Sequence, residues 1–274
     1  MLSPIQIDHY HTFGFLVLRT WLTAGEVRIL REESERTLVE EYRHLPFDGT
    51  RRHFSCMLGA GSPLSASLFE DPRFFDAAED LHGPVMGQWC DANRYVDAVT
   101  PWHPDLGQSF EQGGVKFLIY LDPVTPERGA IRFIPGSHHR PLHERVRAFM
   151  ESAKPAPESV PAIACATQPG DVVAFNFPLW HASVGGFPDR RLNTLAYHPC
   201  PVDDQQRRRR ADEMTAAIPA NQGYGWKGEV YPDSWVASAA GNPRRRILVE
   251  RLRAAGVLQA AQAARPRETA TAMP

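Results

Sequence analysis

Two histidines and one carboxylate give the chain its clearest chemical signature. His103 and Asp105 stand two positions apart in T-P-W-H-P-D, and His181 follows later in N-F-P-L-W-H-A-S. In an extended segment, residues i and i+2 face the same side, so His103 and Asp105 can point toward one ion. Two imidazoles and one carboxylate are the ligands of non-haem Fe(II) oxygenases, which leave positions open for a co-substrate and O2. The spacing predicts a ferrous site, against the alternative of a loop histidine beside a turn aspartate.

Arg190 and Arg191 are the second feature, because they follow His181 and open the next strand-like segment. A guanidinium is a fork-shaped partner for the distal carboxylate of an iron-bound 2-oxo acid. Neighbouring residues of a strand face opposite ways, so only one of the two should point inward, and the sequence leaves open which. The alternative is that both arginines only keep a strand edge soluble.

Three nearby features have two interpretations each. Lys116 has apolar neighbours in V-K-F-L-I-Y-L-D, and its ammonium either approaches a substrate or co-substrate carboxylate or forms a salt bridge at the rim. Trp102 and Trp180 each precede a predicted ligand, and we expect them to pack rather than to stack on substrate. The segment P-G-S-H-H over 135–139 is expected to be a turn, although its histidines are alternative substrate groups.

Short apolar strands separated by Pro and Gly turns supply the frame for these residues. Strand-like segments cover 13–18, 115–122, 129–139, 158–166, 171–177 and 192–198. Several short strands with such turns predict a sandwich or double-sheet barrel and not a βαβ fold.

Helices are expected at both ends of this β region. Thr23 and Glu26 form a T-x-x-E capping box that opens an amphipathic helix reaching about Tyr42. Further helices are expected over 73–90 and 244–263, and 44–63 is expected to be a loop. We therefore expect a single domain over 1–274, with a β core at about 95–200, helical additions at both ends and a candidate lid over 203–243.

A series of motifs, in this order, resembles the phytanoyl-CoA dioxygenase family of Fe(II)/2-oxoglutarate-dependent oxygenases. The resemblance runs from near the N-terminus to about residue 200 and comprises F-G-F-L-V-L with L-T-x-x-E-V, W-H-P-D, Y-L-D-P, G-A-I-R-F-I-P-G-S-H-H, Q-P-G-D-V-V-A-F-N, L-W-H-A-S and R-R-L-N-T-L-A-Y. It implies a mainly β double-stranded β-helix, or jelly roll, with flanking helices. It also implies that His103, Asp105 and His181 hold Fe(II), and that Ser183 with Arg190 or Arg191 holds 2-oxoglutarate.

The same resemblance implies the reaction. The expected enzyme uses O2 and 2-oxoglutarate to oxidise, most simply to hydroxylate, a C–H bond of a small molecule of secondary metabolism, with release of succinate and CO2. Halogenating relatives lack the carboxylate that Asp105 supplies, so we expect no halogenation. Two alternatives are a non-catalytic jelly-roll binding protein and a cupin-type metal-dependent isomerase or lyase.

Composition and charge limit the classes of partner that the protein is expected to bind. The 274 residues carry 30 Lys+Arg against 32 Asp+Glu, and this balance does not favour nucleic acid. The run R-R-R-R over 207–210 has acidic neighbours and is expected on a solvated helix or lid, while the aromatic residues of 224–235 either cover the barrel mouth or form a dimer contact. No apolar run is long enough to span a membrane, and the four cysteines lack a C-x-x-C pair, which favours the reducing cytoplasm. Whether the chain is a monomer or a homodimer stays open.

Overall fold

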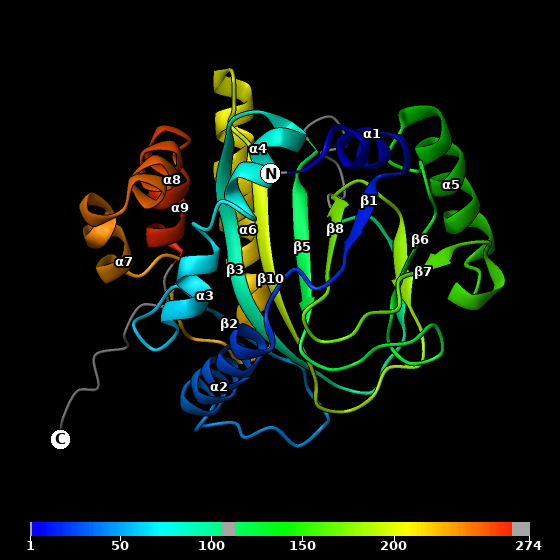
Figure 1. Ribbon diagram of the computed structural model, residues 1–274, viewed down its shortest axis with the longest axis horizontal. Coiled ribbons are helices and arrows are strands. Elements are labelled where there is room, and N and C mark those ends of the chain that lie inside the picture. The colour runs from blue at the N-terminus through cyan, green and yellow to red at the C-terminus, as the bar shows by residue number, and fades with distance from the viewer. Residues whose placement is uncertain (1, 106–112, 265–274) are drawn as a thin grey trace.

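Two antiparallel sheets packed against each other form the centre of the molecule (Figure 1). A computed structural model describes residues 2–105 and 113–264. Within these ranges the larger sheet has six strands in the order β1-β8-β5-β10-β3-β2, and the smaller sheet has four in the order β4-β9-β6-β7. The strands are β1 (Phe15–Leu18), β2 (His53–Cys56), β3 (Val85–Tyr95), β4 (Thr100–His103), β5 (Val115–Tyr120), β6 (Ile131–Phe133), β7 (Ile163–Ala164), β8 (Val172–Asn176), β9 (His181–Ser183) and β10 (Arg190–Pro199).

Pairing between strands that are distant in the sequence closes this sandwich. β10 lies between β3 and β5, and β9 lies between β4 and β6, in antiparallel register throughout. Apolar side chains from both sheets fill part of the space between them, and the rings of Phe133 and Phe175 lie 5.3 Å apart there. The predicted barrel of short antiparallel strands is therefore confirmed.

Helices cover the outer faces of both sheets. The large core joins the outer face of the six-stranded sheet to helices from both ends of the chain, and α5 packs outside the smaller sheet (Figure 1). The helices are α1 (Pro4–Phe13), α2 (Ala24–Glu41), α3 (Pro63–Leu68), α4 (Phe75–His82), α5 (Arg140–Ala153), α6 (Asp204–Gln222), α7 (Asp233–Ala237), α8 (Pro243–Ala254) and α9 (Val257–Ala263), with 3-10 turns at Pro157–Ser159 and Ser238–Gly241. No helix in the described part is both long and apolar enough to cross a membrane.

The predicted capping box is present at the start of α2. The Glu26 amide donates to the Thr23 hydroxyl, and the Thr23 amide donates to the Glu26 carboxylate at 2.8 Å. These two bonds satisfy orphan backbone donors at the helix start, so α2 begins where the sequence predicts.

Two local predictions are wrong in this region. The helix expected over 73–90 ends at His82, because Gly83 adopts a positive φ of 68° and Pro84 follows, and the chain then enters β3. The expected loop over 44–63 contains β2, whose backbone finds its partners on β3. A strand that depends on a distant partner leaves little signal in its own sequence.

The C-terminal part is more helical than predicted. The 203–243 segment contains α6 and α7, and Gly256, with φ of 73°, divides the expected helix over 244–263 into α8 and α9. Trp226, Tyr231 and Trp235 are buried in the large core and so do not form an exposed contact surface. The arginine run lies in α6, where Arg207 pairs with Asp204 and the buried Arg210 pairs with Glu213.

Candidate metal centre and substrate pocket

The strand pair β4–β9 brings the three predicted metal ligands together. His103 ends β4 and lies opposite His181, which begins β9, and the two imidazole rings are 4.3 Å apart. Asp105 follows two residues after His103, and its backbone amide donates to the Phe177 carbonyl at 3.0 Å. One antiparallel register thus assembles side chains that are distant in the sequence.

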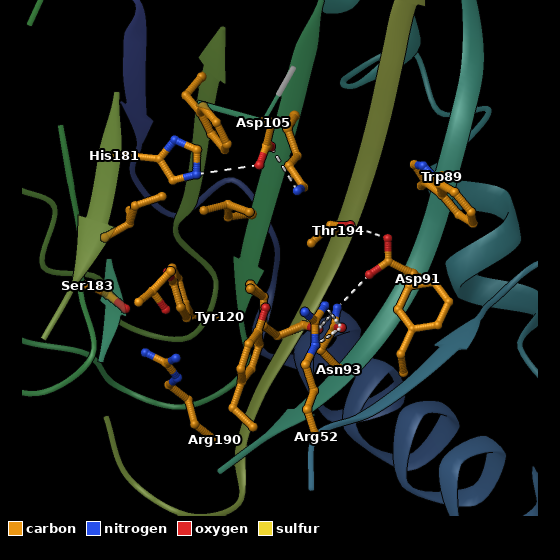
Figure 2. Close-up of a pocket in the computed structure, with 18 of the residues that line it drawn as sticks. Arg52, Trp89, Asp91, Asn93, Asp105, Tyr120, His181, Ser183, Arg190 and Thr194 are labelled. Atoms are coloured by element: carbon orange, nitrogen blue, oxygen red, sulfur yellow. Dashed lines mark hydrogen bonds and ion pairs between the residues drawn. The ribbon is translucent and has the colours of Figure 1, made fainter. Parts of the chain in front are cut away.

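The donor atoms of this cluster converge on one point (Figure 2). Asp105 Oδ1 lies 3.8 Å from His103 Nε2 and 3.5 Å from His181 Nε2. Each imidazole Nδ1 lies 2.8 Å from a backbone carbonyl, that of Pro101 for His103 and that of Leu179 for His181. A ring that donates through Nδ1 keeps its lone pair on Nε2, the atom that faces Asp105. This donor set fits a divalent iron ion.

The charges around the cluster favour metal binding. Burial alone would raise the pKa of Asp105, but the Lys116 ammonium and the His181 imidazole outweigh it and lower that pKa far below its usual value. Burial lowers the pKa of His103, and the neighbouring His181 lowers it further. An ionised carboxylate and a neutral imidazole are the protonation states that bind a metal ion.

Lys116 contacts the ligand carboxylate. Its Nζ lies 3.0 Å from Asp105 Oδ2, inside the pocket. The sequence left open a substrate or co-substrate carboxylate and a rim salt bridge. Lys116 does form a salt bridge, but its partner is the candidate metal ligand Asp105 and the pair lines the pocket; contact with a substrate or co-substrate stays a prediction.

The structure separates the two arginines. Arg190 is 4% exposed and lines the pocket, where it donates to the Gly129 carbonyl at 2.6 Å and lies 4.8 Å from the Tyr95 ring. Arg191 faces the opposite side of β10 and pairs with Asp122 at 2.8 Å. Arg190 is therefore the guanidinium on the side of the candidate metal centre.

A cavity of about 290 Å³ joins these groups. Ser183 lines it near Arg190, on the side of His181 (Figure 2). Trp102 and Trp180 pack beside α5 in an apolar cluster, as expected. The 135–139 segment forms a turn before α5, and the side chains of His138 and His139 approach backbone carbonyls of α1, at His11 and Thr12.

A second polar wall of the cavity was missed by the sequence analysis. It consists of Arg52, Trp89, Asp91, Asn93 and Thr194, which lie on or next to β2, β3 and β10 (Figure 2). The alternation of Trp89, Asp91, Asn93 and Tyr95 was the available signal, because every second residue of a strand faces one side. The wrong helix prediction over 73–90 concealed the beginning of that alternation.

Comparison with known proteins identifies the family. The family model "Phytanoyl-CoA dioxygenase" matches residues 10–185, which is more than half of the chain. The chain belongs to the phytanoyl-CoA dioxygenase family. The match includes the three candidate ligands and Ser183 but ends before Arg190.

Two curated relatives are similar to the chain. L-proline trans-4-hydroxylase of Streptomyces griseoviridis is 29% identical over 147 residues, 49% of this chain and 55% of the hydroxylase, so the match spans only about half of that relative. The dioxygenase cdmA of Talaromyces verruculosus is 23% identical over 226 residues, 72% of this chain and 73% of the relative.

Solved structures confirm the jelly roll. HygX from Streptomyces hygroscopicus, crystallised with nickel and 2-oxoglutarate, is 26% identical with a TM-score of 0.57, over 72% of this chain and 87% of HygX. HygX was also crystallised with nickel, 2-oxoglutarate and hygromycin B, with a TM-score of 0.58 to this chain.

Proposed function

We propose that the protein is an Fe(II)- and 2-oxoglutarate-dependent dioxygenase that oxidises a C–H bond of a small molecule, most simply by hydroxylation. His103, Asp105 and His181 would hold the iron. The observation that carries this proposal is the convergence of two Nε2 atoms and one carboxylate oxygen, with both Nδ1 atoms held by backbone carbonyls. When bound, iron with 2-oxoglutarate and O2 supplies the oxidising power, with release of succinate and CO2.

Arg190 and Ser183 are proposed to bind the distal carboxylate of 2-oxoglutarate. Arg190 is buried, has no carboxylate partner among the described residues and leaves its Nε without a hydrogen bond there. A buried guanidinium without an anionic partner is costly, so an incoming carboxylate would compensate it. Ser183 offers a hydroxyl on the same side of the pocket (Figure 2).

The remaining residues orient these groups. Lys116 neutralises Asp105 Oδ2 and leaves Oδ1 toward the two histidines. The backbone carbonyls of Pro101 and Leu179 fix the ring orientations, which is the usual role of groups behind metal-binding histidines.

The two alternative functions fit these observations less well. A binding protein without turnover has no need for an intact ligand set beside a buried, unpaired arginine. A cupin-type isomerase or lyase generally uses three or four His or Glu ligands and no dedicated co-substrate arginine. Asp105 fills the position that a halide needs in halogenating relatives, so we propose oxidation.

The family and its relatives also support finer proposals. We propose a role in secondary metabolism, because the similar HygX was crystallised with hygromycin B. The cysteines, Cys56, Cys90, Cys165 and Cys200, are all free, which fits a reducing compartment such as the cytoplasm.

Succinate formation tests the proposed enzyme. Purified protein supplied with 2-oxoglutarate and O2 should form succinate only when Fe(II) is present, even without the main substrate, because these enzymes turn over slowly when uncoupled. A chelator should stop the reaction, and Fe(II) should restore it. Absence of iron-dependent succinate formation, in protein that binds neither Fe(II) nor 2-oxoglutarate, would contradict the proposal.

A further inference from the structure

Two charged side chains in the pocket have no role in the site described so far. Lys116 is matched with Asp105, and Arg190 is assigned to the co-substrate. Asp91 and Arg52 remain, one anion and one cation, whose charges act on each other along this wall of the pocket. Both lie across the cavity from His181 and Ser183 (Figure 2).

Asp91 is a buried carboxylate with unused hydrogen-bonding capacity. It is 5% exposed and accepts hydrogen bonds from the Thr194 hydroxyl and the Asn93 amide. A carboxylate offers about four acceptor positions, so two bonds leave room for further donors. Burial raises the pKa of Asp91, and the nearby Lys116 ammonium and Arg52 guanidinium offset only part of that rise. The ammonium group of a ligand would fit the remaining acceptor positions of this carboxylate.

Arg52 is held in place by its neighbours but keeps free donors. Its Nε donates to Asn93 Oδ1 at 3.0 Å, and its guanidinium lies over the Tyr95 and Tyr224 rings at 4.7 and 5.2 Å. A guanidinium has five N–H donors, and the acceptors of Arg52 are the Asn93 amide oxygen and the Tyr224 side chain, which leaves donors for a ligand. The group is therefore oriented in advance for a carboxylate, at low entropic cost.

Asn93 fixes the distance between the two charges. Its amide nitrogen donates to Asp91 and its amide oxygen accepts from Arg52, so a single carboxamide separates the carboxylate from the guanidinium. A carboxylate and a guanidinium held at this spacing by one carboxamide match a ligand whose own ammonium and carboxylate are joined by a short linker.

We propose that this wall binds the amino acid head group of the substrate, with its ammonium on Asp91 and its carboxylate on Arg52. The substrate is then a free amino acid or a derivative that keeps both charged groups, and its side chain extends toward His103 and His181. This inference rests on the proposed function, because it assumes that iron and 2-oxoglutarate occupy the other side of the pocket.

Binding to the loaded protein tests the inference without turnover. The protein is loaded with nickel and 2-oxoglutarate and titrated calorimetrically with free amino acids that have linear, branched, cyclic or aromatic side chains. The N-acetyl and methyl ester derivatives of each amino acid remove one charge at a time. At least one free amino acid should bind, and both of its derivatives should bind roughly tenfold to hundredfold more weakly.

Two variants assign each charge to its side chain. Asp91→Asn should weaken binding of the free amino acid by about tenfold or more. It should change the affinity for the N-acetyl derivative by less than about twofold, because that derivative already lacks the ammonium. Arg52→Gln should show the same pattern with the methyl ester. The neighbouring, exposed Arg51 offers the matched control, and Arg51→Gln should bind like the wild type. Thermal melts establish that each variant is folded, and Asp91→Glu provides a second variant that keeps the charge.

Several results would overturn the inference. They are no binding by any free amino acid, equal binding of the charged and blocked forms, or unchanged binding by both pocket variants. Iron-dependent succinate formation by the wild type is measured separately. If it is present while amino acids do not bind, the head-group assignment fails and the dioxygenase proposal stands. If it is absent, and the protein binds neither Fe(II) nor 2-oxoglutarate, the dioxygenase proposal itself fails.

Discussion

Replacing Arg190 and Arg191 in parallel gives the sharpest test of the co-substrate site. The two residues are adjacent and chemically identical, but Arg190 is 4% exposed and faces the pocket, while Arg191 pairs with Asp122 on the other side of β10. Removing one partner of a buried charge pair costs about 2–5 kcal/mol, which is roughly 30-fold to several thousandfold in affinity. We therefore expect Arg190→Gln to raise the KM for 2-oxoglutarate by at least about 30-fold.

Arg191→Gln is the matched control. The Arg191 side chain is 25% exposed, so loss of its pair with Asp122 should lower the free energy of unfolding by about 0–1 kcal/mol and leave the KM unchanged. Arg190→Lys should fall between the wild type and Arg190→Gln, because it keeps the charge but loses the two-pronged geometry.

Iron-dependent succinate formation is measured over a range of 2-oxoglutarate concentrations, and calorimetric binding of 2-oxoglutarate to the nickel-loaded protein is measured in parallel. Thermal melts show whether each variant is folded. Equal 2-oxoglutarate affinity for the folded Arg190→Gln and Arg191→Gln variants would refute the assignment.

Three further predictions concern the metal and the stability of the fold. His103→Ala should abolish stoichiometric Fe(II) binding with little change in melting temperature, because this side chain is 41% exposed; retained iron, measured by elemental analysis, would argue against the ligand set. Glu26 has a pKa of about 2, held below its usual 4.5 chiefly by its hydrogen bond to Arg73, so its stabilisation is complete above pH 4.5 and is lost as the pH falls toward 2. Because this pair is partly exposed, Glu26→Gln should lower the free energy of unfolding, measured in urea, by only about 1 kcal/mol at pH 7 and by less at pH 3.5. A loss of stability that becomes larger at the lower pH would contradict the assignment. Gly185→Ala should lower the free energy of unfolding by at least about 1–3 kcal/mol, because φ is 59° there and a Cβ would lie 1.7 Å from the Glu127 carbonyl oxygen; wild-type stability in denaturant would show that this loop relaxes freely.

Local spacing explains why much of the candidate site was predictable. The two-residue step from His103 to Asp105 and the position of His181 are properties of the sequence itself, and an extended backbone converts such a step into one shared face. The Thr23 capping box likewise acts within a single turn of helix, so the start of α2 was predicted correctly.

Features that depend on pairing between distant strands were not predictable in the same way. β2 and the first half of β3 were assigned to a loop and a helix, because their partners are supplied by segments far away in the chain. The second polar wall, with Asp91 and Arg52, was not predicted either, because its position in the pocket depends on these two strands.

The sequence by itself determined the donor types of the metal centre, the family and the double-sheet barrel, since these follow from residue identity, short spacing and turn chemistry. Only the tertiary structure decided that Arg190 faces the pocket, that Lys116 pairs with Asp105, and that Asp91 and Arg52 lie across from the metal ligands. The physical reason is register: alternation along a strand establishes that neighbours face opposite ways, but the packing of the whole sheet decides which of the two faces is inside.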